Sequence, residues 1–107
     1  MFKMEIALDE QKILQDGKYA PEDISKSIDK LFSSLRIEKQ GDGLYSGGSG
    51  SDFAGYGRAI LFLKEKTWFM PYVDKWLWYN SKGSNHVEDF QVEDLAAHYK
   101  RRVGIPS

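Results

Sequence analysis

The chain has 107 residues and a formal net charge of −1, from 15 basic and 16 acidic side chains. This length suits one domain and is too short for two, so we expect residues 1–107 to form a single globular domain. The near-zero net charge argues against bulk attraction to nucleic acid or to an anionic membrane. The absence of cysteine excludes disulfides, cysteine-ligated zinc and thiol nucleophiles.

The sequence also predicts where the protein works. No stretch approaches the roughly 20 consecutive apolar residues that cross a bilayer. The N-terminal residues contain no apolar run of signal-peptide length. Small secreted domains often depend on disulfides, so a cysteine-free chain favours the cytoplasm. We expect a cytoplasmic protein without a membrane segment.

Two elements are predicted near the N-terminus. In residues 2–8 the apolar side chains alternate with their neighbours, which predicts a strand with one buried face. A helix is the alternative there, because Met, Glu, Ala and Leu are good helix formers. Asp9 is suited to cap a short helix over residues 10–15, and Gly17 is suited to end it.

The helical period is clearest in the next segment. Its apolar residues share one stripe, with polar side chains between them: Ile24, Ile28, Leu31, Phe32 and Leu35. Pro21 suits the first helical position, and the acidic residues that follow complement the positive end of the helix dipole. We predict a helix over residues 21–35.

The middle of the chain predicts a hairpin, a loop and a strand. Residues 36–46 suit two short strands joined at Gly41–Gly43. Residues 47–57 read GGSGSDFAGYG, a composition typical of a flexible glycine-rich loop. The run of five apolar residues from Ala59 to Leu63 predicts a buried strand over residues 58–65.

The third quarter of the chain is rich in aromatic side chains. Residues 67–73 fit either a helical turn or a returning strand, and we favour the helical turn. Residues 75–80 (KWLWYN) predict a strand. On it Trp76 and Trp78 point to one face while Leu77 and Tyr79 point to the other, so both faces are apolar.

The last predicted element is a helix over residues 90–102. Its stripe consists of Val92, Leu95, Ala96, Tyr99 and Val103. Together these elements predict an α+β domain. It has a small, mainly antiparallel sheet of three to five strands and two main amphipathic helices, at 21–35 and 90–102. If both helices cover the same face of the sheet, the opposite face lies open to water or to a partner.

No motif predicts catalysis, cofactor binding or a metal site. The glycine-rich loop lacks the Gly-Lys-Ser/Thr ending of a phosphate-binding loop. Asp94 and His98 lie four residues apart, and His86 is a third potential metal ligand, but a helical ion pair explains the same spacing. We therefore predict no catalytic, cofactor or metal residues, and we favour a non-enzymatic role.

Two functional hypotheses follow. The first is a protein-binding or regulatory module that binds a protein partner or a second copy through an aromatic surface, because Trp and Tyr are enriched at interface hot spots. Its candidate residues are Trp68, Tyr72, Trp76 and Trp78. The alternative is a nucleic-acid-associated accessory protein that uses the basic end of the last helix: Lys100, Arg101 and Arg102.

Overall fold

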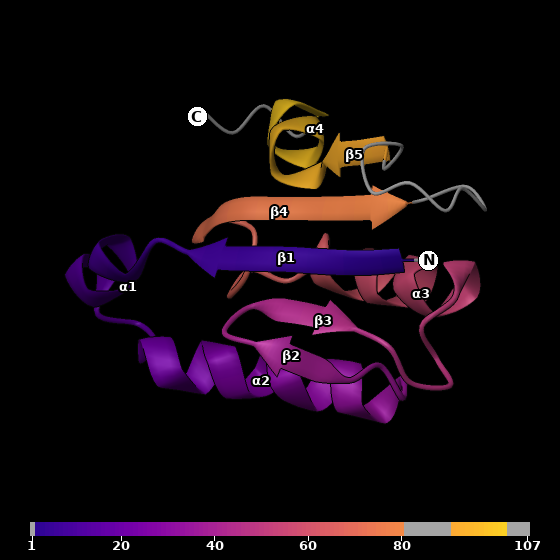
Figure 1. Cartoon of the computed structure of the whole chain (residues 1–107). Helices are drawn as coiled ribbons and strands as arrows, with labels where there is room; N and C mark the ends of the chain where they lie inside the picture. Colours follow the sequence, from indigo (N-terminus) through magenta and orange to yellow (C-terminus); the bar gives the residue numbers. More distant parts are fainter. Residues whose placement is uncertain (1, 81–90, 103–107) are drawn as a thin grey trace.

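The computed structural model describes residues 2–80 and 91–102, which form a five-stranded antiparallel sheet and four helices (Figure 1). The strands lie in the order β2-β3-β1-β4-β5. This confirms the predicted α+β fold. In chain order the elements are β1 (Phe2–Leu8), α1 (Glu10–Asp16), α2 (Pro21–Ser34), β2 (Lys39–Gly41), β3 (Leu44–Ser46), α3 (Phe53–Leu63), β4 (Val73–Asn80), β5 (Gln91–Asp94) and α4 (Leu95–Arg102).

The first two helices begin and end on the predicted signals. The Asp9 carboxylate accepts a hydrogen bond from the Lys12 amide at 3.1 Å, which caps α1. Gly17 ends α1 in the left-handed conformation, with φ 68°. Pro21 begins α2 in its first turn. The buried residues of α2 repeat at the helical period: Ile24, Ile28 and Phe32.

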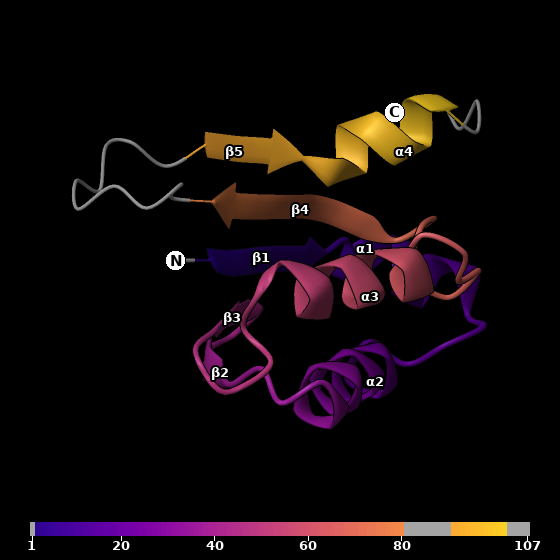
Figure 2. The ribbon, with the colours of Figure 1, turned by 90° about the vertical axis from the view of Figure 1, so that its right-hand side faces the viewer.

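The helices α2 and α3 lie behind the strands in Figure 1, on one side of the sheet, and α4 follows β5 beside β4 at the edge of the sheet (Figure 2). Pairing between β1 and β4 sets Met4 opposite Trp78 and Ile6 opposite Trp76, and these four side chains are buried. Their chain neighbours project from the other face, which none of the described helices covers. The two sides of the sheet therefore have different chemistry.

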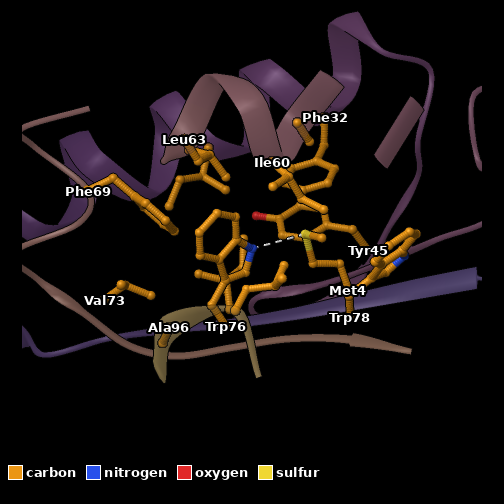
Figure 3. Packing of buried hydrophobic residues seen from close by; sticks show 14 of the residues in the cluster. Met4, Phe32, Tyr45, Ile60, Leu63, Phe69, Val73, Trp76, Trp78 and Ala96 are labelled. Atoms are coloured by element: carbon orange, nitrogen blue, oxygen red, sulfur yellow. Dashed lines mark hydrogen bonds between the residues drawn. The ribbon is translucent and has the colours of Figure 1, made fainter. Parts of the chain in front are cut away.

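Trp76 lies at the centre of the core (Figure 3). Its indole Nε1–H donates to the Met4 Sδ at 3.2 Å, and the Phe69 ring meets it edge-on with centroids 5.0 Å apart. The Tyr99 ring of α4 contacts the same indole at 5.7 Å. Strand, turn and C-terminal helix are thus packed around one side chain.

The strand predicted over residues 58–65 is wrong, because these residues belong to α3 or to the turn after it. The Asp52 carboxylate accepts a hydrogen bond from the Gly55 amide at 2.7 Å and so caps the helix. The buried residues then follow the helical period: Tyr56, Ala59, Ile60 and Leu63. The apolar run hides this period because the helix is apolar on its other side as well.

The glycine-rich segment also differs in part from the prediction, since Phe53 to Gly57 form the first turns of α3. In the remaining loop, the Gly50 amide donates to the Arg36 carbonyl at 2.9 Å. A Cβ on Gly50 would lie 1.6 Å from the Leu35 carbonyl oxygen. Close backbone approach to the end of α2 therefore requires this glycine. Mobility of the loop stays a prediction.

The predicted C-terminal helix begins later than expected. Residues 91–94 form β5 and pair with β4, and α4 starts at Leu95, while residue 90 lies outside the described part of the chain. The Asp94 carboxylate caps α4 by accepting from the Ala97 amide at 3.0 Å. Val92 is consequently 51% exposed on the edge strand and is not part of the buried helical stripe.

Candidate functional site

Three of the four residues of the predicted aromatic surface are buried. The side chains of Trp76 and Trp78 are 0% and 7% exposed, and that of Tyr72 is 3% exposed. Trp76 and Trp78 share one face of β4, as predicted. The helices cover this face and leave the face of Leu77 and Tyr79 uncovered. Trp68, half-buried in the turn after α3, is the remaining predicted residue.

Apolar side chains are exposed instead along the outer side of α3. Leu61 is 59% exposed and Phe62 40%. The rings of Phe62 and Trp68 contact each other, with centroids 6.3 Å apart. We call this region the α3 surface, and we define it by its five residues: Arg58, Leu61, Phe62, Glu65 and Trp68.

The α3 surface also carries charge. Arg58 and Glu65 are exposed, Arg58 three residues before Leu61 on α3 and Glu65 four residues after it, in the turn that follows the helix. Neither forms an ion pair with another residue of the described chain. Beside them, the Lys66 ammonium lies 4.3 Å from the Phe62 ring centroid. The surface thus combines an aromatic and aliphatic centre with charges of both signs.

The uncovered face of the sheet is more polar. On it the Tyr79 hydroxyl donates to the Glu5 carboxylate at 3.0 Å, and Lys75 lies 3.8 Å from the same carboxylate. The Lys3 ammonium lies 4.6 Å from the Tyr79 ring centroid. Burial, together with the hydrogen bond to Glu5, raises the pKa of Tyr79. Charged groups therefore cross the middle of this face.

A cleft of about 720 Å³ lies between α1, α2 and the turn that joins β2 to β3. On its wall, the Tyr45 hydroxyl donates to one Asp29 oxygen at 2.6 Å, and the Lys39 ammonium contacts the other at 3.0 Å. Burial and the bond to Asp29 raise the pKa of Tyr45 far above its usual range. Asp29 thus joins α2 to β2 and β3.

The predicted basic cluster lies at the end of α4. The Lys100 ammonium donates to the Val73 carbonyl, so this cation joins α4 to the start of β4. Arg101 and Arg102 complete the helix, but their side chains lie outside the described part of the structure. The prediction that these three residues contact nucleic acid therefore stays a prediction.

The structure does not group the residues that were considered as potential metal ligands. Asp94 caps α4, His98 is exposed on that helix, and His86 lies outside the described residues. Within residues 2–80 and 91–102, no three acidic or imidazole side chains are grouped as metal ligands would be. None of the helices in those ranges is long and apolar enough to cross a bilayer.

The chain matches no protein-family model, and no curated protein matches it. Apart from Trp68, the residues of the α3 surface were missed in the sequence because residues 47–65 were divided between a loop and a buried strand. The signal that identifies them is Asp52 as a helix cap, followed by inward residues at Tyr56, Ala59, Ile60 and Leu63.

Proposed function

We propose that the protein is a non-enzymatic protein-binding or regulatory module and that the α3 surface is its binding site. One observation carries the proposal: α3 packs one apolar side against the sheet and exposes a second, where Leu61 is 59% and Phe62 40% accessible. A helix that is apolar on all sides is ordinarily buried on all sides. A partner surface would complete the burial of α3.

The composition of the α3 surface supports the same conclusion. Interface centres are enriched in aromatic side chains and arginine, and the surface contains Phe62, Trp68 and Arg58. Trp68 and Phe62 already contact each other, so their rings are partly fixed before a partner arrives. Such pre-ordering lowers the entropy that binding must overcome.

The two other candidate surfaces have less support. The uncovered sheet face is crossed by the contacts among Lys3, Glu5, Lys75 and Tyr79, which binding would have to desolvate. Nucleic-acid binding by the end of α4 is weakened as a hypothesis because the Lys100 ammonium is bonded to a backbone carbonyl.

A matched pair of leucine substitutions tests the proposal. Leu61 on α3 and Leu14 on α1 are similarly exposed, at 59% and 66%. The immobilised wild-type protein is expected to retain a defined set of proteins from a lysate of its own cells. Leu61→Glu should lose that set and Leu14→Glu should keep it. Circular dichroism confirms that both variants are folded.

Equal retention by all three proteins would contradict the proposal, and so would equal loss in both variants. Trp76→Ser is unsuitable for this experiment. Its indole is fully buried, so the variant is expected to unfold and to lose binding for that reason alone.

A further inference from the structure

We infer that the α3 surface binds a second copy of this chain, with the two α3 helices antiparallel across a two-fold axis. The inference rests on the proposed function and names the partner. In a two-fold interface the same residues serve on both sides, so the surface must be complementary to itself. The α3 surface meets this condition in its charges and in its shape.

The charges are arranged symmetrically about the apolar centre. Along the chain, Arg58 comes three residues before the pair Leu61–Phe62, and Glu65 comes three residues after it, in the turn that follows α3. Antiparallel pairing about this centre brings Arg58 of each copy opposite Glu65 of the other. Two equivalent ion pairs then form, each between Arg58 of one copy and Glu65 of the other. A parallel arrangement would instead oppose like charges.

The shape of the outer side also suits a second helix. Gly57 lies in the interior of α3, one turn before Leu61, and a Cβ placed on it meets no atom within 4 Å. Glycine at such a position disfavours a helix relative to alanine. Within the described chain no close contact requires it, in contrast to Gly55, whose Cβ would meet the Gly50 carbonyl oxygen at 1.9 Å. A side chain of the second copy has room at this position.

The size of the surface sets the strength of the dimer. α3 has 11 residues, which span about 16 Å at about 1.5 Å per residue. A pair of such helices buries less than the roughly 800 Å² per partner of a standard stable interface. The dimer should therefore be weak and reversible, with a Kd on the order of 10–100 μM.

A charge-swap series measured by sedimentation equilibrium tests the inference. The purified full chain is compared with Arg58→Glu, Glu65→Arg and the double variant over roughly 1–500 μM. Each single variant opposes like charges twice and should weaken the dimer about tenfold or more. The double variant restores opposite charges and should recover the wild-type Kd within a factor of about three. Lys30→Glu reverses an exposed cation on α2 and should leave the Kd unchanged.

Three results would overturn the inference: a monomer at all concentrations, a dimer that the single reversals do not weaken, or no recovery in the double variant. The capture experiment with Leu61→Glu and Leu14→Glu distinguishes failure of this inference from failure of the proposed function. If the chain is monomeric but Leu61→Glu still loses its captured proteins, the α3 surface binds a different partner. If the chain is monomeric and capture does not depend on Leu61, both conclusions fall.

Discussion

The helices α2 and α3 lie in the same layer and cover the same face of the sheet (Figure 2), but their outer sides differ completely. Every exposed side chain of α2 is polar: Glu22, Asp23, Ser25, Lys26, Ser27, Lys30, Ser33 and Ser34. The outer side of α3 exposes Leu61 and Phe62. Packing against the sheet explains the inner sides of both helices. It does not explain the outer side of α3.

The two helices are also attached differently. The Phe32 ring of α2 stacks on the Tyr45 ring with centroids 4.0 Å apart, and Asp29 accepts the Tyr45 hydroxyl hydrogen bond. α3 is fixed through Tyr56, whose hydroxyl contacts the Tyr45 carbonyl at 3.2 Å and the Ser51 hydroxyl at 3.0 Å. Both attachments are internal. The difference between the helices is therefore confined to the surface that each shows to its surroundings.

The largest expected effect concerns the inner sides, where the two helices should behave alike. Ile28 of α2 is 2% exposed and Ile60 of α3 is 7% exposed. Replacing either by alanine removes buried methyl groups and leaves a cavity, so each variant should lose about 2–5 kcal/mol of unfolding free energy. Urea denaturation measures both. A loss below about 1 kcal/mol at Ile60 alone would show that α3 is not part of the core.

Two glycines of α3 provide the next comparison. A Cβ on Gly55 would lie 1.9 Å from the Gly50 carbonyl oxygen, whereas a Cβ on Gly57 meets open space. Gly55→Ala should therefore destabilise the fold by about 1–3 kcal/mol through overpacking. Gly57→Ala should stabilise it by about 0.5–1 kcal/mol through helix propensity. Thermal unfolding of dilute protein compares them, and equal effects would contradict the packing described for the loop.

A smaller effect is expected from the hydrogen bond that attaches α2 to β3. Its contribution to the unfolding free energy should depend on alkaline pH. Tyr45→Phe removes the hydrogen bond to Asp29 and should lower stability by about 1 kcal/mol at neutral pH. The raised pKa of Tyr45 keeps its proton in the folded state, while the unfolded chain releases it above a pKa of about 10. Wild-type stability should therefore fall as the pH rises above about 10.

Urea titrations of both proteins at neutral and alkaline pH test this sign. Phenylalanine carries no hydroxyl, so the stability of Tyr45→Phe should fall less steeply over the same pH interval. Tyrosines that the two proteins share contribute equally to both curves. Parallel curves would show that Tyr45 does not titrate differently in the folded and unfolded chain.

The smallest effect on folding is expected on the outer sides. Leu61→Gln on α3 and Lys30→Gln on α2 change exposed residues away from the core, so each should shift the unfolding free energy by at most about 0.5 kcal/mol. The two variants should differ in association, which only Leu61→Gln weakens. A loss of stability at Leu61 well above this size, in dilute monomer, would give the exposed leucine a structural role.

Much of the fold was predictable because local signals decide it. The alternation in residues 2–8, the cap at Asp9 and the stripe of α2 each depend on neighbours within a few residues. The helical structure of the α3 segment was not predictable, because its apolar run shows no helical period and its glycine content is typical of a loop. Gly55 is in fact required by contact with the backbone of Gly50 from the preceding loop, which no local pattern shows.

The candidate site was predictable only in part. The sequence shows that β4 has two apolar faces, but the choice between them depends on where the helices pack. Trp78 is buried as a result, although its indole nitrogen has no hydrogen-bond partner among the residues that the structure describes. Trp68 alone of the predicted residues belongs to the α3 surface. The rest of that surface became apparent once α3 was known to be a helix.

The most direct test of the α3 surface is residue-level NMR of the ¹⁵N-labelled wild-type chain, recorded from dilute to concentrated solution. The account predicts that the amide signals of Arg58, Leu61, Phe62 and Glu65 and the indole signal of Trp68 shift with concentration. The signals of the outer side of α2 and the indole of Trp76 should stay in place. Shifts centred on the outer side of α2 or on the uncovered sheet face would contradict it.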